Sequence, residues 1–530
     1  MSGPWWQRGV VYQVYPRSFQ DTDGDGVGDL GGIERRLDYL SALGIDAIWI
    51  SPICPSPMAD FGYDVADYCD VDPLFGGLDD FDRLIAAAHG RGIKVILDFV
   101  PNHSSDRHPW FLESRSSRQS ARRDWYIWRD PAPDGGPPNN WISDFGGSAW
   151  EWDEASGQYY YHAFLKDQPD LNWRNPDVRH AMLDALRFWL DRGVDGFRID
   201  VLWHLIKAED FPDNPLNPHY HPSLGEMHKV MQLHSTDQPE VHEIAVEMRR
   251  LADSYGDRVL IGEIYLPIEK LMTYYGRAQD GVHLPFNFQL IDAAWNARGI
   301  ARIIQQYEAA LPPGGWPNWV LGNHDRPRVA AKLGEAQARV AAMLLLTLRG
   351  TPTIYYGDEL GIGDVEIPAD RVRDPRELRE PGLGLGRDPV RTPMPWDGSA
   401  NAGFSSGEPW LPLNHDWRQR NVAAQERDPG SMMHLYRQLL AIRRAHEALS
   451  VGSIELIDCE GDVLAYERSA GEDRLLVALN LGGDQQRFRL PGWAAGYQPL
   501  LSTIGQSRNH GSDNKYVLHP NEGVILGRVA

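Results

Sequence analysis

The chain has 530 residues, of which 42% are hydrophobic and 24% are charged, a balance typical of globular proteins with one large domain and smaller ones. Its 74 acidic residues against 52 basic ones give a formal charge of −22. This charge argues against nucleic acid and anionic membrane surfaces as partners, because both favour clustered lysine and arginine, whereas a neutral small molecule is compatible with it.

Short apolar runs rich in β-branched and aromatic residues alternate with helical patterns along most of the chain. The apolar runs predict strands at residues 10–15, 47–50, 94–100, 196–199, 259–262, 284–288, 319–321 and 353–356. Helices are expected at residues 32–43, 78–91, 176–192, 240–255, 300–311, 334–348 and 432–448. Eight strands alternating with helices predict an α/β protein with a parallel (β/α)8 TIM barrel. A doubly wound open sheet is the alternative, which the absence of a glycine-rich phosphate loop after the first strand disfavours.

Three segments interrupt this alternation. Residues 103–173 are rich in Trp, Gly, Pro and Asn and too long for an ordinary loop, so they predict an inserted subdomain after strand 3. Residues 358–417, rich in Gly, Pro and Arg, are expected to fold over the mouth of the barrel. Residues 451–530 alternate with period two, at 463–466, 474–479, 486–490 and 523–526, which predicts a C-terminal antiparallel β-sandwich. The barrel would then consist of residues 1–102 and 174–450.

No uncharged apolar run approaches the roughly 20 residues that a membrane span requires, and residues 1–8 lack the pattern of a signal peptide. The cysteines, Cys54, Cys69 and Cys459, are scattered and form no CxxC motif, which fits a reducing compartment. We therefore expect a cytoplasmic protein without a membrane partner, present as a monomer or a small homo-oligomer.

Four apolar runs end in charged or polar residues, at 98–103 (DFVPNH), 196–200 (GFRID), 261–263 (IGE) and 323–325 (NHD). A carboxylate beside apolar β-branched residues is costly unless it is paired or used. One such residue would usually be an ion-pair partner, but three in succession favour a sugar-cleaving site. The carboxyl ends of barrel strands meet at one face, so we expect these side chains to lie together above strands 4, 5 and 7. They are Asp200, Glu263 and Asp325, accompanied by His103, Arg198 and His324.

The loop after the first strand has carboxylates at every second position with glycines between them, the pattern of a loop that wraps oxygen ligands around a hard cation. The candidate ligands are Asp21, Asp23, Asp25, Val27 and Asp29. Ca²⁺ is the expected ion, with Mg²⁺ as an alternative, and no organic cofactor is indicated. The loop is not an EF-hand, because the position that would need Glu is Gly32. A solvated acidic turn is the other interpretation.

The four stretches resemble the conserved regions of glycoside hydrolase family 13, the α-amylase family. Residues 44–52 (GIDAIWISP), 168–173 (QPDLNW) and 350–361 (GTPTIYYGDELG) agree with it, so the similarity covers essentially the whole chain. The opening, YQVYPRSFQDTDGDGVGDLGGI, and the QPDLNW block resemble the exo-acting α-glucosidase and oligo-1,6-glucosidase branch.

This resemblance implies a retaining mechanism of two displacements. Asp200 would be the nucleophile, Glu263 the general acid and base, and Asp325 would hold sugar hydroxyls and stabilise the transition state. Arg198 would keep Asp200 ionised, and the imidazoles of His103 and His324 would donate hydrogen bonds to the sugar.

The resemblance also implies a pocket that is closed beyond a terminal glucose. Tyr63 would stack on the ring, and Asp60 would pair with an arginine beyond strand 8. Arg391 is our choice and Arg387 the alternative, since Pro395 stands where the family motif has Gln. Further glucose-pocket positions are Phe145, Phe164 and Gln168, for which packing inside the inserted subdomain is the competing interpretation.

Val201 follows the candidate nucleophile, and in similar enzymes Val at this position tends to accompany α-1,6 cleavage. Residues 202–205 depart from the oligo-1,6-glucosidase pattern, so this clue has limited weight. The sequence predicts a retaining exo-α-glucosidase that acts on short α-glucosides and transfers glucose at high substrate concentration. The alternatives are a trehalose synthase or sucrose-converting isomerase, and a non-catalytic relative, which the three retained carboxylates disfavour.

Overall fold

The computed structural model describes residues 3–505 and 515–528 and is built around a sheet of eight parallel strands. The strands are β1 (Val11–Val14), β2 (Ala47–Ile50), β3 (Lys94–Phe99), β7 (Gly196–Ile199), β8 (Val259–Gly262), β9 (Leu284–Pro285), β10 (Asn318–Val320) and β11 (Thr351–Tyr355). Their order is β10-β11-β1-β2-β3-β7-β8-β9. A parallel bridge between Asn287 and Trp319 joins the residues after β9 to β10. The sheet therefore closes on itself, and the predicted TIM barrel is confirmed.

Alternate residues of the strands fall into two apolar clusters, as the two-residue period of a strand requires. Trp49 and Ile96 belong to the cluster that fills the barrel. Ile48 and Val95, their neighbours in sequence, belong to the larger cluster shared with the surrounding helices. Because both faces of each strand are buried, the strands appear in the sequence as continuous apolar runs.

The main helices pack around the barrel. They are α2 (Leu30–Arg35), α3 (Leu37–Leu43), α4 (Leu78–Gly90), α6 (Pro176–Asp191), α7 (Val241–Asp253), α9 (Ala297–Ala310), α11 (Glu335–Thr347) and α14 (Met432–Ala445). Shorter helices are α1 (Trp5–Arg8), α5 (Pro109–Ser116), α8 (Ile268–Leu271), α10 (Val329–Leu333), α12 (Pro375–Arg379), α13 (Val422–Gln425) and α15 (Glu447–Ser450).

Three predicted elements differ from the structure. The helix expected at 432–448 is divided into α14 and α15, because His446 between them is extended (φ −115°, ψ 114°). The single helix expected at 32–43 is divided into α2 and α3, because Arg36 between them has non-helical angles (φ −99°, ψ 6°) and Asp29 caps α2 by accepting from the Gly32 N–H. The strand expected at 284–288 ends at Pro285. Beyond it, the Phe286 N–H still donates to Gly262 of β8 while the Asn287 N–H donates to Asn318 of β10, so the chain crosses between the two neighbours.

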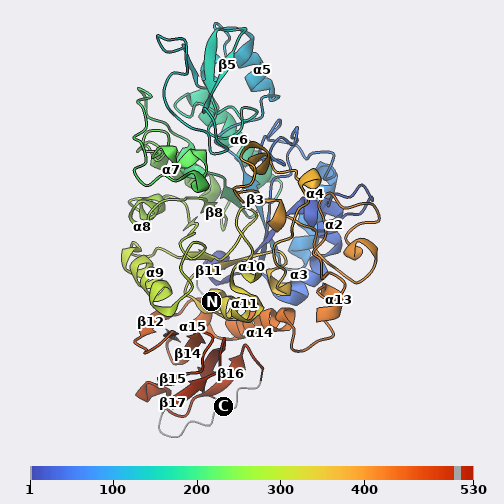
Figure 1. Ribbon diagram of the computed structural model, residues 1–530, viewed down its shortest axis with the longest axis vertical. Helices are drawn as coiled ribbons and strands as arrows, with labels where there is room; N and C mark the ends of the chain where they lie inside the picture. The colour runs from blue at the N-terminus through green and yellow to red at the C-terminus, as the bar shows by residue number, and fades with distance from the viewer. Residues whose placement is uncertain (1–2, 506–514, 529–530) are drawn as a thin grey trace.

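The segment after β3 carries a three-stranded antiparallel sheet in the order β4-β6-β5, made of β4 (Trp128–Arg129), β5 (Trp150–Asp153) and β6 (Gln158–Tyr161). It lies at the top of Figure 1, at the opposite end of the molecule from the C-terminal sheets. Aromatic side chains such as Trp141, Trp150 and Tyr161 form its own small core. An antiparallel bridge between His103 and Asp170 joins the two ends of this segment beside the barrel.

The C-terminal region is an antiparallel β-sandwich, as predicted. A five-stranded sheet in the order β12-β13-β14-β18-β16 and a two-stranded β15-β17 sheet share one apolar cluster. The strands are β12 (Ser453–Ile457), β13 (Val463–Ala470), β14 (Asp473–Asn480), β15 (Gln486–Arg489), β16 (Gln498–Ser502), β17 (Lys515–Leu518) and β18 (Gly523–Gly527). Strands β12, β16 and β17 were missed from the sequence. No residue of β12 and only Ser502 of β16 is fully buried, so neither shows a clear apolar alternation, and β17 has only four residues.

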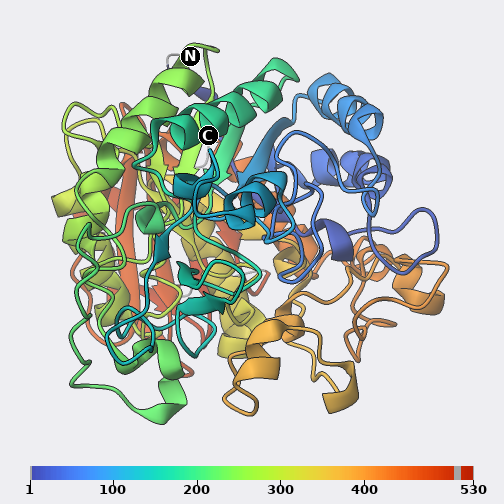
Figure 2. The same cartoon turned by 90° about the horizontal axis from the view of Figure 1, so that it is seen from above.

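The segment after β11 lies beside the loops of the N-terminal quarter of the chain, orange next to blue in Figure 2. The Asp21 N–H donates to the Phe404 oxygen, and the Trp410 N–H donates to the Gly26 oxygen. The segment thus covers one side of the barrel mouth and holds the acidic loop that follows β1.

Candidate active site

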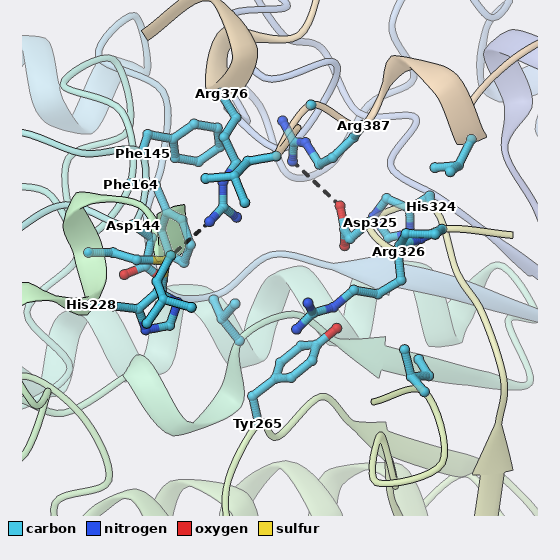
Figure 3. A pocket seen from close by; sticks show the side chains of 18 of the residues that line it. Asp144, Phe145, Phe164, His228, Tyr265, His324, Asp325, Arg326, Arg376 and Arg387 are labelled. Carbon is cyan, nitrogen blue, oxygen red and sulfur yellow. Dashed lines mark hydrogen bonds and ion pairs between the residues drawn. The ribbon is translucent and has the colours of Figure 1, made fainter. Parts of the chain in front are cut away.

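A cavity of about 1090 Å³ opens at the carboxyl ends of the barrel strands, between the barrel, the inserted subdomain and the segment after β11. Figure 3 shows side chains of all three parts pointing into it. The predicted site residues that line it are Asp60, Tyr63, His103, Phe145, Phe164, Gln168, Asp200, Val201, Glu263, His324 and Asp325. Arg198 and Arg391 lie behind this lining and are 1% and 0% exposed.

Arg198 on β7 joins three carboxylates that come from three different strands. Its Nη1 lies 2.8 Å from Oδ1 of Asp98 and 2.6 Å from Oδ1 of Asp200, and its Nη2 lies 2.7 Å from Oε2 of Glu263. All four groups are buried. A planar guanidinium with several N–H groups suits this arrangement, because one charge can orient more than one carboxylate.

Burial raises the pKa of Asp98, Asp200 and Glu263, and the neighbouring Arg198 guanidinium opposes this rise at each of them. Repulsion between the carboxylates adds to the rise. Three buried carboxyls around one cation favour a state that retains a proton, since full ionisation would leave excess negative charge out of water. The cluster can therefore hold an ionised carboxylate beside a protonated one, as acid–base chemistry at a sugar requires.

Tyr63 and His324 form a hydrogen-bonded chain along the floor of the cavity. Gln13 Nε2 lies 2.8 Å from Nδ1 of His324, whose Nε2 lies 2.7 Å from the Tyr63 hydroxyl. That hydroxyl donates to Oδ2 of Asp98 across 3.0 Å. With Gln13 as donor, the imidazole proton stands on Nε2 and points to Tyr63. Burial lowers the pKa of His324, so the ring is neutral and serves as a fixed hydrogen-bonding group.

Asp325 follows β10 and is held ionised. Its Oδ1 lies 2.8 Å from Nη2 of Arg391 and 3.5 Å from Nη1 of Arg387, and its Oδ2 lies 3.2 Å from Nε2 of His324. Burial acts to raise the pKa of Asp325, but these neighbours outweigh it and hold the pKa below its usual range. A permanent negative charge here can stabilise positive charge that develops on a sugar ring.

The pairing of Asp60 with Arg391 is wrong, because the alternative, Arg387, is its partner. Nη2 of Arg387 lies 2.6 Å from Oδ1 of Asp60 and 2.7 Å from Oδ1 of Asp374. Asp374 is buried as the N-cap of α12, and its bidentate contact directs the Arg387 fork toward Asp60. Arg391 instead donates from Nε to the His324 oxygen across 2.8 Å, so it supports Asp325 from behind.

His103 and Gln168 lie beside this pair. Nε2 of His103 lies 3.1 Å from the backbone carbonyl oxygen of Tyr63 and 3.1 Å from Nε2 of Gln168. The same Gln168 nitrogen lies 3.5 Å from Oδ2 of Asp60. On its other side, Nδ1 of His103 lies 3.1 Å from Nδ2 of Asn102. Burial lowers the pKa of His103 to about 4. The histidine is therefore a neutral, fixed group at the same end of the cavity as Asp60.

Phe145 and Phe164 both line the cavity and pack on each other, with ring centroids 6.3 Å apart. Phe164 also lies 5.1 Å from the His103 ring, and the Arg387 guanidinium lies 5.1 Å over the Phe145 ring. The two rings thus pack within the inserted subdomain and line the cavity at the same time, so the two interpretations do not exclude each other.

Val201 lines the cavity in an unusual conformation. Its backbone is left-handed (φ 38°, ψ 46°), and its N–H donates to Oε2 of Glu263 across 2.9 Å. A β-branched residue in this region is strained by of order 1–3 kcal/mol, and such strain persists only where surrounding contacts hold it. The turn directs Asp200 and Val201 to the cavity from adjacent positions.

Sequence reasoning assigned no role to several residues of this site. Asp98 stands in the first motif stretch, and its position at the end of an apolar run could have indicated a site carboxylate. Gln13 is a polar residue within an apolar strand, which is a comparable signal. The remaining ones gave none, because they come from loops whose path the sequence does not reveal; they are Asp144, Trp203, Tyr265 and Arg326.

The acidic loop gathers a smaller set of carboxylates than predicted. Oxygens of Asp21, Asp23 and Asp29 lie within 4.8 Å of one another, so this part of the donor set fits a hard cation that takes oxygen ligands. Asp25 does not join this group and instead accepts from the Val27 N–H across 2.7 Å. Val27 could contribute only its backbone carbonyl oxygen, so the ligand set of five residues stays a prediction, with these three carboxylates as the part that the structure gathers.

Known proteins with similar sequences are enzymes that act on α-glucosides. A family model described as alpha amylase, catalytic domain, matches residues 13–452. A probable alpha-glucosidase of Rhizobium meliloti (strain 1021) is 43% identical over 502 residues, which covers 92% of this chain and 91% of the relative. An oligo-1,6-glucosidase of Parageobacillus thermoglucosidasius is 39% identical over 530 residues, with 93% of each chain covered.

Solved structures of related enzymes have the same fold over nearly the whole chain. The structure of an alpha-glucosyl transfer enzyme, 41% identical, matches with a TM-score of 0.95 and covers 99% of this chain and 100% of its own. The trehalulose synthase of Pseudomonas mesoacidophila, 38% identical, matches with a TM-score of 0.90 over 99% of this chain and 100% of its own. Among the residues that the structure describes, no helix has the length and apolar character needed to cross a membrane.

Proposed function

Since this chain belongs to the alpha-amylase family and is a glycoside hydrolase of the α-glucosidase type, we propose that it releases glucose from the non-reducing ends of short α-glucosides with retention of configuration. The observation that carries this proposal is a cavity in which one buried arginine, Arg198, orients both Asp200 and Glu263. The substrate would be an oligosaccharide or another small glucoside, and neither nucleic acid nor membrane would be a partner.

In the first step, the Asp200 carboxylate attacks the anomeric carbon while the bond from that carbon to the leaving oxygen breaks. Glu263 gives its proton to that oxygen, so the aglycone leaves as an alcohol and a covalent glucosyl-enzyme remains. Asp325 faces the positive charge that develops on the ring, and its ionised state is supported by Arg391 and Arg387.

In the second step, the Glu263 carboxylate takes a proton from water as the water oxygen attacks the anomeric carbon. The bond to Asp200 breaks, glucose leaves with the original configuration, and Glu263 is protonated again. A sugar hydroxyl can replace water in this step. We therefore expect transglucosylation at high substrate concentration. The expectation would be wrong if concentrated maltose or isomaltose yielded only glucose.

Exo action is supported by the ion pair between Asp60 and Arg387, which lies beside Gln168 and Phe145 and closes one end of the cavity. A chain that extends past this pair on the non-reducing side would collide with buried charged groups. The glucose hydroxyls would instead satisfy the polar atoms of Asp60, Arg387 and His103.

The competing function is isomerisation of a disaccharide such as sucrose. It is favoured by the similarity to solved structures named trehalulose synthase and isomaltulose synthase, at 38% and 37% identity. Both reactions pass through a glucosyl-enzyme and differ in whether water or the released sugar attacks it.

The test is the initial rate of glucose release from isomaltose, maltose, sucrose and trehalose, with Asp200→Asn as the inactive control. Free glucose from maltose or isomaltose, with the α-anomer appearing first, supports the proposal. Rearranged disaccharide with little free glucose would overturn hydrolysis in favour of isomerisation, and activity in the Asp200→Asn variant would overturn the assignment of the nucleophile.

We further propose that Asp21, Asp23 and Asp29 hold a structural Ca²⁺, with Mg²⁺ as the alternative, and that the ion keeps the loop after β1 in place. A cytoplasmic location is proposed on the basis of the free cysteines Cys54, Cys69 and Cys459.

A further inference from the structure

We propose that Gln13, a buried residue of β1, is a positioning residue for the reaction: its side-chain N–H fixes His324 in the form that carries the ring proton on Nε2. Through His324 it orients Tyr63 and, beyond Tyr63, the carboxylate of Asp98. Gln13 is 0% exposed, so it acts on the substrate only through these neighbours. This inference deepens the proposed function and rests on it, because it concerns the same site.

The direction of the hydrogen bonds is set at the Asp98 end of this chain. Oδ2 of Asp98 lies 3.1 Å from Nε1 of Trp49, and its Oδ1 lies 2.8 Å from Nη1 of Arg198. An indole N–H and a guanidinium N–H can only donate, so an Asp98 carboxylate, which only accepts, satisfies both. The Tyr63 hydroxyl, 3.0 Å from Oδ2, therefore gives its single proton to Asp98.

The position of the proton on His324 follows from this. Because the Tyr63 hydroxyl donates to Asp98, it can only accept from Nε2 of His324, 2.7 Å away. Oδ2 of Asp325 lies 3.2 Å from the same nitrogen and is also an acceptor, and Figure 3 shows the two side chains next to each other. Nε2 thus carries the proton, and Nδ1 keeps the lone pair that Nε2 of Gln13 meets at 2.8 Å.

The two polar atoms of the Gln13 amide are used unequally. Its Nε2 faces His324 and also lies 3.2 Å from the Ser51 hydroxyl, whereas its Oε1 is buried without a hydrogen-bond partner among the residues that the structure describes. A buried carbonyl without a donor is costly, and an apolar side chain of similar size would avoid that cost. What the amide contributes at this position is therefore the N–H that faces His324.

Without this donor the other form of the ring becomes accessible. A proton on Nδ1 would leave the Nε2 lone pair facing the Asp325 carboxylate and would deprive Tyr63 of its donor. The Tyr63 ring is parallel to the His324 ring within 3°, with centroids 5.4 Å apart, so a displaced imidazole disturbs Tyr63 directly. We expect the loss to fall on the placement of Asp325 and Asp98, and so on the chemical step more than on glucose binding.

The experiment compares Gln13→Met, which removes the amide at similar size, with Asn318→Leu as its matched control. Asn318 of β10 is also 0% exposed, its Nδ2 donates to the Thr351 oxygen across 2.9 Å, and its Oδ1 likewise has no hydrogen-bond partner in the described part of the chain. The substrate is maltose or isomaltose, whichever the natural protein hydrolyses faster. Gln13→Met should lower kcat about tenfold with KM changed by less than about threefold, and Asn318→Leu should leave kcat within about twofold.

A double-mutant cycle shows whether the effect passes through His324. In a His324→Gln background, the further change Gln13→Met should alter kcat by less than about twofold, since the ring that it orients is gone. A further tenfold loss in that background would overturn the inference. So would an Asn318→Leu variant that loses as much kcat as Gln13→Met, because the effect would then belong to any buried amide of the barrel.

The form of the ring can also be measured without a variant of Gln13. In protein labelled with ¹⁵N in its histidine rings, the resonances that His324→Gln removes should belong to an imidazole with a protonated Nε2 and a bare Nδ1. A proton on Nδ1 would overturn the inference even if Gln13→Met does not fold. Failure of the proposed function is a separate result, since the natural protein would then release no glucose from maltose or isomaltose whatever the form of the ring.

Discussion

The Val201 N–H donates to Oε2 of Glu263, so the residue that follows the proposed nucleophile is held by the proposed acid–base residue, which follows the neighbouring strand. This bond and the Arg198 contact use the same Glu263 oxygen. The left-handed conformation of Val201 and the orientation of Glu263 therefore depend on each other. Catalysis and the stability of this turn should be separable by substitutions of Glu263.

Glu263→Gln keeps an oxygen that can accept from Val201 but cannot donate and recover a proton as a carboxyl does. We expect kcat to fall by at least about 10²-fold, the usual contribution of a general acid, with little change in thermal stability. Glu263→Ala should lose the same activity and also leave the buried Val201 N–H without its acceptor, which lowers stability by about 1–3 kcal/mol. Thermal unfolding of both variants beside their kcat values checks this, and equal melting temperatures would contradict the structural role.

Val201 lines the cavity directly after Asp200 in the chain. If its methyl groups select α-1,6 linkages, Val201→Thr should shift the ratio of kcat/KM for isomaltose over maltose toward maltose by roughly tenfold, because a methyl group is exchanged for a hydroxyl of similar size that can hydrogen-bond a sugar. Initial rates with both disaccharides measure the ratio. An unchanged ratio would show that Val201 does not select the linkage.

The barrel could be predicted from the sequence because its strands are buried on both faces, so that runs such as Ala47–Ile50 and Gly196–Ile199 coincide with the structure at both ends. The carboxylates that follow β7 and β8 were found for the same reason, since each ends an apolar run. What failed was pairing over a long sequence distance. Arg387 and Arg391 are four residues apart in a loop without a period, and only the N-cap Asp374 directs one of them to Asp60.

The residues at the mouth of the cavity could not be predicted from the sequence for a related reason. Leu224 and Met231 belong to a stretch of short 3-10 turns between β7 and α7, in which no repeating apolar spacing indicates a buried face. This stretch is held by the segment after β11, which is far away in the chain; the Glu226 N–H, for example, donates to Oε1 of Glu380. Their place beside the cavity can therefore be seen only once the packing of these distant segments is known.

His162 gives a prediction for the pH dependence of stability that is independent of the active site. It is buried in the inserted subdomain, with Nδ1 2.8 Å from the Phe164 oxygen, and burial lowers its pKa to about 4. As the pH falls below about 6.5, the unfolded chain binds this proton first, so the contribution of His162 is present above pH 6.5 and lost toward pH 4. The loss amounts to about 3 kcal/mol.

Buried carboxyls with a raised pKa have the opposite effect on stability, because they bind protons more readily in the folded chain. Burial raises the pKa of Asp64 to about 6, for example. The contribution of His162 must therefore be isolated by comparison with a variant. The stability of His162→Gln relative to the natural protein should rise by about 3 kcal/mol between pH 7 and pH 4. Urea denaturation at pH 7, 5.5 and 4.5 measures it. His221→Gln, at an exposed position, is the control that should show no such trend, and parallel curves for His162→Gln and the natural protein would refute the prediction.

Removal of the proposed metal should loosen the loop after β1 and the segment that packs on it. An ion present at a hundredfold excess over its Kd stabilises the folded state by about 2.7 kcal/mol, so a chelator should lower the melting temperature by several degrees and Ca²⁺ should restore it. Asp21→Asn should abolish this response, because Asp21 is one of the three gathered carboxylates and also accepts from Ser405. Restoration by Mg²⁺ alone would change the identity of the ion, and a chelator without effect on the natural protein would end the metal proposal.

The two arginines beyond β11 should fail in different ways when each is replaced by lysine. Arg387 bridges Asp60 and Asp374 with one planar fork, which a single ammonium cannot reproduce, so Arg387→Lys should weaken the closed end and raise KM by about tenfold or more. Arg391 does not line the cavity but fixes Asp325 and the His324 oxygen, so Arg391→Lys should lower kcat by about 10²-fold through a poorly placed transition-state charge. Steady-state kinetics with maltose separates the two constants for each variant. The opposite pattern, a KM effect at Arg391 and a kcat effect at Arg387, would overturn the roles proposed here for the two arginines.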